Sequence, residues 1–256
     1  MTLRFGTIKR KASRAERTKL EDVVKLLVDT AMGREKADLV IRGGNLVNVN
    51  SGELLENMDV AIKKGRIALI GKADHTIGNK TVVIDAAGKY IAPGFLDGHV
   101  HVESSMITVT QFARAVLPHG TTSVFIDPHE IANVLGLEGV KLMLDEAKGL
   151  PLKVFVCVPS CVPSAPGFET AGAEITPADV EEALRWEGVV GLGEMMNYPG
   201  VLRGDEKVCE EIRATLQANK VVEGHADGLL NMELAAYAAA GITSCHESTR
   251  KIDGVQ

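Results

Sequence analysis

The chain has 256 residues, 45% of them hydrophobic, and a formal net charge of −6 at pH 7. These values predict a folded chain with a large core, and about 250 residues is typical of one α/β barrel. The negative charge argues against a nucleic-acid partner. Residues 4–19 are basic, and we interpret them as a solvated segment.

The sequence also limits where the protein works. It has no apolar run as long as a membrane span, and its first residues lack the apolar core of a signal peptide. Its four cysteines fit a reduced compartment better than a disulfide framework. We therefore expect a cytoplasmic protein with no membrane partner.

The first 36 residues are predicted to be a helical segment. Ser13 and Glu16 have the spacing of a capping box, and apolar residues then recur at helical spacing from Leu20 to Val28. Gly33 is expected to end this helix. Residues 37–88 change to short β runs separated by Gly, Asn and Ser, which predicts a small β domain, composite and sandwich-like.

Residues 89–256 alternate apolar strands with helical stretches. The strands are expected at 90–97, 122–126, 153–158, 189–193, 220–223 and 242–244, and the helices at 107–118, 134–147, 177–186, 207–218 and 231–240. Strand followed by helix, repeated, indicates parallel strands with crossover helices. The fold class is therefore α/β. We expect a TIM-like barrel, of which this chain contains the first six strands, and a doubly wound open sheet is the alternative.

Polar residues lie at the C-terminal ends of these strands, which is where the active sites of α/β barrels are found. His99 and His101 are two apart on one strand, so both side chains point to the same side. Glu194, His225 and His246 end three later strands. Together they are enough to hold two divalent ions with the glutamate as the bridge, although each alone could be an ordinary polar group at a strand end.

Longer motifs resemble a known family. Gly-Phe-Leu-Asp-Gly-His-Val-His at 94–101 resembles the amidohydrolase superfamily, and the extension Val-Glu-Ser-Ser-Met at 102–106 resembles its adenine deaminase branch. The resemblance continues in Asp-Pro-His-Glu at 127–130, Gly-Glu-Met-Met-Asn at 193–197 and Gly-His-Ala at 224–226, and it covers the chain from about residue 20 to its end.

The resemblance implies a metal centre and a reaction. His99 and His101 would hold one metal, His225 and His246 the other, and Glu194 would bridge them. Members typically use Mn or Fe(II), and Zn is also compatible with these ligands. The implied activity is hydrolytic deamination of adenine, a small purine base, to hypoxanthine and ammonia by a hydroxide that bridges the two metals, as in purine salvage. Whether the chain forms a homo-oligomer is left open.

Further residues are candidates for catalysis and substrate binding. Glu194 and Glu103 are the catalytic candidates, and Glu103 either protonates or contacts the purine or orients a metal-bound imidazole. The substrate-binding candidates are Glu103, Ser104, His129, Glu130 and Glu247. His129 and Glu130 could instead be an extra ligand set, and for these two and Glu247 a structural role is at least as well supported.

The sequence also departs from the family. The chain ends after the sixth expected strand, so the last two strands and the final Asp of the family have no counterpart, and we expect a partial chain. Asp227 and Cys245 stand where the family often has Pro and Asp. Two alternatives remain: another amidohydrolase reaction on a cyclic amide, or a catalytically incomplete scaffold that holds metal.

Overall fold

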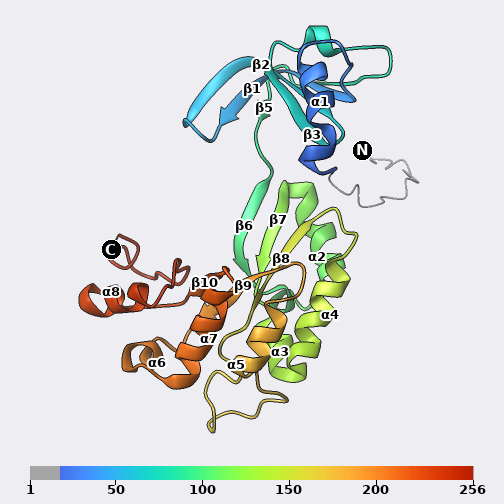
Figure 1. Cartoon of the computed structure of the whole chain (residues 1–256). Coiled ribbons are helices and arrows are strands. Elements are labelled where there is room, and N and C mark those ends of the chain that lie inside the picture. Colours follow the sequence, from blue (N-terminus) through green and yellow to red (C-terminus); the bar gives the residue numbers. More distant parts are fainter. Residues whose placement is uncertain (1–17, 256) are drawn as a thin grey trace, which may run out of the picture. The chain divides into compact units, whose positions relative to one another are not determined.

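The computed structural model describes residues 18–255, so the predicted capping box at 13–16 and most of the basic segment lie outside the described residues. The chain divides into two compact units, one ending at Pro93 and one beginning at Gly94 (Figure 1). Among the described residues, no helix combines the length and the apolar character that a membrane crossing requires.

The first unit combines one helix with one mixed sheet. Helix α1 (Leu20–Ala31) contacts β2 (Glu53–Lys63) and β3 (Arg66–Gly71). It ends as predicted, because Gly33 adopts a left-handed φ of +76°. Strand β1 (Leu39–Asn48) lies between β2 and β4 (Val82–Asp85), and β5 (Tyr90–Ile91) pairs with its far end.

The sequence predicts a sandwich-like β domain here, whereas the described residues of this unit form a single sheet. Its small core consists of Ala37, Val40, Ala61 and Ala73, with Leu69 and Ile77 packed against it. Residues beside the 3-10 turn Asp74–Thr76, rather than a second sheet, cover these side chains.

The predicted strand at 90–97 is divided in the structure. Its first part, β5, pairs with β1, and β6 (Phe95–Val100) begins the second sheet. Pro93 lies between the two parts, and a proline cannot donate to a strand ladder. Gly94 follows it, where a Cβ would lie 2.2 Å from Oγ1 of Thr122.

The second unit is built on five parallel strands, which stand next to one another in chain order (Figure 1). They are β6, β7 (Thr121–Ile126), β8 (Lys153–Val158), β9 (Val189–Met195) and β10 (Val221–Gly224). Of the sixth predicted strand, only a bridge between Ile242 and Val222 forms. The sheet is therefore a five-stranded half-barrel, which confirms the predicted α/β class.

Helices connect these strands. They are α2 (Val109–Val116), α3 (His129–Leu135), α4 (Leu137–Ala147), α5 (Pro177–Ala183), α6 (Tyr198–Arg203), α7 (Glu206–Gln217) and α8 (Asn231–Ala239). Five match predicted helices. The other two, α3 and α6, were not predicted, because helices of 7 and 6 residues are too short to show a clear period.

Helix α7 carries a buried carboxyl that should make stability depend on pH. Glu211 is 1% exposed, its Oε1 has no hydrogen-bond partner, and burial raises its pKa from 4.5 to about 8. Between these two values the folded chain keeps a proton that the unfolded chain loses. The free energy of unfolding should therefore fall as the pH rises through this range.

We expect Glu211→Gln to remove this dependence. Between pH 5 and pH 8, the free energy of unfolding of the variant should rise by roughly 3 kcal/mol relative to that of the unmodified chain, since one pKa unit is worth about 1.4 kcal/mol. Urea unfolding at the two pH values measures the difference. Glu210→Gln, which changes an exposed residue of the same helix, is the control. An equal response of both variants would contradict the prediction.

Candidate metal centre

One carboxylate lies at the centre of the candidate site. Glu194 is in β9, and its side chain is only 6% exposed. Five imidazoles face its two oxygens: those of His99, His101, His129, His225 and His246. The four histidines predicted as metal ligands are among them, so the structure brings the whole predicted ligand set together.

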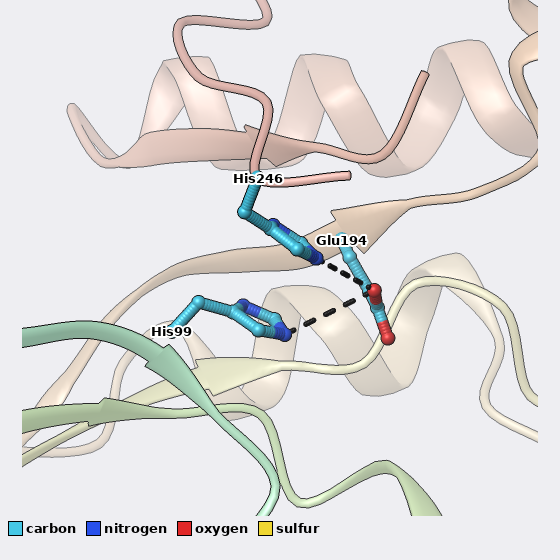
Figure 2. Close-up of side chains that lie close together, drawn as sticks. All are labelled: His99, Glu194 and His246. Carbon is cyan, nitrogen blue, oxygen red and sulfur yellow. Dashed lines mark hydrogen bonds and ion pairs between the residues drawn. The ribbon is translucent and has the colours of Figure 1, made fainter. Parts of the chain in front are cut away.

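The imidazoles divide between the two oxygens of Glu194. His101 Nε2 lies 3.1 Å and His129 Nδ1 3.4 Å from Oε1. His225 Nδ1 lies 2.7 Å and His246 Nε2 3.1 Å from Oε2, while His99 Nε2 is 3.9 Å from the same oxygen. Figure 2 shows His99 and His246 directed toward Glu194 from two separate segments, with their rings stacked at 3.7 Å between centroids.

The parallel sheet explains why residues so far apart in the chain meet here. His99 lies in β6, with His101 just after it. His225 directly follows β10, and His129, three residues after the end of β7, is the first residue of α3. The ends of parallel strands meet at one edge of a sheet, which places these side chains together. Ser160 Oγ donates to the Glu194 carbonyl at 2.8 Å and so fixes the end of β9.

Tyr237, on α8, fixes the segment that carries His225. Its hydroxyl donates to the Met195 carbonyl at 2.7 Å and accepts the backbone N–H of His225 at 2.9 Å. The side chain is 2% exposed. This buried hydroxyl therefore links the end of β9 to the residue after β10, a role that sequence reasoning did not assign.

The outer nitrogens of three imidazoles have partners that orient the rings. His101 Nδ1 lies 2.8 Å from the Asp127 carbonyl, and His129 Nε2 lies 2.9 Å from the Cys161 carbonyl. His99 Nδ1 lies 3.3 Å from Oε2 of Glu223. Metal-binding histidines commonly use such partners to hold the ring and to select the tautomer. Sequence reasoning missed Glu223, although it lies in β10, two residues before His225.

The electrostatics reflect this crowding around one carboxylate. Burial raises the pKa of Glu194, but the hydrogen bonds from the surrounding histidines outweigh it, so its pKa is lowered overall. The hydrogen bond to Glu194 raises the pKa of His101 to about 9 and that of His246 in the same direction. The centre thus attracts positive charge, which protons or metal cations can supply.

Asp127 adds a second carboxylate that sequence reasoning quoted only as part of a motif. It is 0% exposed, and neither side-chain oxygen has a hydrogen-bond partner among the described residues. Burial raises its pKa to about 7. Gly193 makes room for it, because a Cβ there would lie 2.1 Å from Oδ2 of Asp127. The Asp-x-His spacing of Asp127 and His129 was the available signal.

The remaining candidates lie around this core. Ser104 donates to Oε1 of Glu130, and Oε2 of Glu130 is 3.4 Å from His101 Nδ1. Glu247 has a carboxylate oxygen within 4.8 Å of ligand atoms of His225 and His246. Glu103 accepts the backbone N–H of Ile131 at 3.2 Å through Oε1, and its buried Oε2 has no hydrogen-bond partner within residues 18–255. Burial raises the pKa of Glu103.

The donor set fits divalent cations. Imidazole nitrogens and carboxylate oxygens converge within 4.8 Å in three overlapping groups: His99, Glu194 and His246; His225, His246 and Glu247; and Asp127, His129 and Glu194. Imidazole suits Zn, Cu and Fe, and carboxylate suits Mn. The two buried, unpartnered oxygens of Asp127 are further evidence, since burying a carboxylate without a partner is costly.

The close approach of Gly193 and Asp127 gives a testable result. We expect Gly193→Ala to lower the free energy of unfolding by about 2–3 kcal/mol, because overpacking a core costs about that much. In an Asp127→Ala background the same change should cost clearly less. Chemical denaturation of the unmodified chain, the two single variants and the double variant measures the coupling between residues 193 and 127. Gly98→Ala, whose added Cβ would meet no atom within 4 Å, is the control, and equal costs in both backgrounds would contradict the prediction.

Residues 90–255 match the model of the amidohydrolase family. A protein named adenine deaminase from Moorella thermoacetica is 60% identical over 240 residues, which are 93% of this chain and 40% of that protein. Adenine deaminase 3 from Rhizobium meliloti is 57% identical, over 91% of this chain and 40% of that protein. The chain therefore spans about two fifths of the length of these curated relatives.

Solved structures share the fold at low identity. A putative prolidase from Bifidobacterium longum has a TM-score of 0.57 and 20% identity, over 80% of this chain and 52% of that one. The atrazine chlorohydrolase TrzN from Arthrobacter aurescens TC1, solved in complex with zinc, has a TM-score of 0.57 and 17% identity, over 78% of this chain and 55% of that one. These likenesses support the half-barrel architecture.

Proposed function

This chain belongs to the amidohydrolase family, and on that premise we propose that it carries the metal centre of an adenine deaminase, which converts adenine and water to hypoxanthine and ammonia. One observation carries the proposal: five imidazoles converge on the buried Glu194. The identity of 60% to a protein named adenine deaminase supports the choice of substrate.

We propose that two divalent cations, Mn or Fe(II), bind at this centre. His99 and His101 would hold one, His225 and His246 the other, with Glu194 between them. Oε1 of Glu194 faces His101, while Oε2 faces His225 and His246 and, at 3.9 Å, His99. Contact of both oxygens with imidazoles supports a bridging role. When bound, such cations supply Lewis acidity that brings the pKa of a coordinated water toward neutrality.

The protein's own residues would manage the protons of the reaction. Deamination adds an oxygen to C6 of adenine and breaks the bond from C6 to the amino nitrogen, which must gain a proton to leave as ammonia. Glu103 is the proposed proton carrier, because burial raises its pKa and keeps its proton available closer to neutral pH. Its Oε2, buried and without a partner, is free to take this role.

The polar residues beside the histidines would bind the purine. Ser104 and Glu130 are hydrogen-bonded to each other and exposed, and Glu247 lies beside His225 and His246. Hydroxyl and carboxylate groups suit the alternating donors and acceptors of a purine edge. His129 was predicted to contact substrate as well, but its burial and its approach to Glu194 favour a place within the metal centre.

The direct test is conversion of adenine to hypoxanthine by the chain after loading with Mn²⁺ or Fe²⁺, with His99→Ala as the control. We expect ammonia release that the control loses. Turnover of a cyclic amide in place of adenine would instead support a different amidohydrolase activity. Bound metal without any turnover would favour a metal-binding scaffold and contradict the deaminase proposal for this chain.

A further inference from the structure

A group of donor atoms lies beside the predicted ligand sets. A carboxylate oxygen of Asp127, a ring nitrogen of His129 and a carboxylate oxygen of Glu194 are all within 4.8 Å of one another, and all three residues are buried. Only Glu194 belongs to the ligand set implied for the two metals, and His129 was considered from the sequence only as part of a possible extra ligand set with Glu130. Asp127 and His129 come from the end of β7 and the start of α3.

The hydrogen bonds of His129 leave a lone pair in this group. Its Nε2 lies 2.9 Å from the Cys161 carbonyl, which can only accept, so Nε2 carries the hydrogen. In a neutral ring Nδ1 is then an acceptor, yet it faces Oε1 of Glu194, another acceptor, at 3.4 Å. Acceptors that face one another need a positive charge between them.

Asp127 strengthens this need. Its two oxygens are fully buried and have no hydrogen-bond partner among the described residues. A proton shared with His129 would satisfy one contact at most, whereas a cation can bind several oxygens and nitrogens at once. Asp127 also brings a negative charge of its own to this position, in addition to that of Glu194.

The backbone is adapted to hold Asp127 in place. Any side chain at residue 193 would occupy the position of its carboxylate, since a Cβ there would lie 2.1 Å from Oδ2 and 2.7 Å from Cγ. The neighbouring residue is Glu194 itself. The same segment of β9 therefore provides both the space for one carboxylate and the second carboxylate of the group.

We propose that Asp127, His129 and Oε1 of Glu194 bind a divalent cation at a position of its own, separate from the ions of His99 with His101 and of His225 with His246. His101 faces the same oxygen at 3.1 Å and would lie beside this ion. The proposal adds a cation to the proposed centre, but it does not depend on adenine being the substrate.

Equilibrium dialysis against Mn²⁺, with bound manganese counted by mass spectrometry, tests this position. We expect Asp127→Asn to bind one Mn²⁺ fewer than the unmodified chain. The double variant His99→Ala/His225→Ala should retain one Mn²⁺, which a further Asp127→Asn change should remove. Unchanged binding by Asp127→Asn, or no Mn²⁺ on the double variant, would overturn the proposal.

Two additional measurements separate a lost ion from a lost fold. Asp127→Asn should unfold in EDTA at the same temperature as the unmodified chain or higher, because it removes a buried unpartnered carboxylate. His129→Gln should lose the same single Mn²⁺, and Glu211→Gln, which changes a buried carboxyl of α7 outside the three donor groups, should lose none. Failure of the deaminase proposal alone would appear as normal Mn²⁺ counts without hypoxanthine formation.

Discussion

Glu194→Gln is expected to weaken Mn²⁺ binding at least about 100-fold, since even partners of metal ligands contribute 10- to 100-fold to affinity. The substitution keeps the size of the side chain but removes the negative charge that five imidazoles face. An amide also offers one oxygen where the carboxylate offers two, so it cannot serve both groups of histidines. Deamination should fall with the bound metal.

Dialysis against a series of Mn²⁺ concentrations measures this effect directly. Glu211→Gln is a matched control, because it makes the same chemical change at a buried position of the same unit. Far-UV circular dichroism in EDTA shows whether each variant is folded. Near-normal affinity in a folded Glu194→Gln chain would mean that the histidines hold the metals without this carboxylate.

The position of the site was predictable because it depends on regular features. Side chains at the ends of parallel strands share one edge of the sheet, and the strands were visible as apolar runs. His99 and His101 could be placed on one side of a strand by their spacing. His225 and His246 followed from the same argument, and the structure places all four against Glu194.

Residues that act through burial or partnering were harder to find. Asp127 precedes Pro128, and the sequence does not reveal that both of its oxygens are buried without partners. Tyr237 lies in a nine-residue helix with four alanines, and only the fold shows its hydroxyl between Met195 and His225. Such contacts join segments distant in the chain, which no local pattern encodes.

Strand boundaries failed for a different reason. The apolar run from Tyr90 continues past Pro93 into Leu96, so its composition indicates a single strand. The proline interrupts the ladder, and the two parts pair in different sheets. The predicted strand at 242–244 forms only one bridge, after which the chain continues toward His246. Apolar composition therefore identified strands but not where their pairing ends.

Glu103→Gln is expected to separate the two roles considered for this residue. If Glu103 carries the proton that lets ammonia leave, deamination should fall about 10²- to 10⁴-fold, the usual contribution of a positioned acid or base, while Mn²⁺ binding stays unchanged. The substitution suits the test, because glutamine keeps an oxygen that can accept the N–H of Ile131, the contact that holds the side chain.

The alternative role has a different signature. If Glu103 only orients His101, then Glu103→Gln should lower the affinity for Mn²⁺ by about 10- to 100-fold. Activity should then recover at high Mn²⁺ concentration. Measuring the rate of hypoxanthine formation at saturating and limiting Mn²⁺ distinguishes the two results. Ser105→Ala, at an exposed position of the same 3-10 turn (Val102–Ser105) and outside the proposed purine contacts, is the control. The buried, partnerless Oε2 of Glu103 favours the first result, since an orienting carboxylate would have that oxygen bonded to the ring it holds.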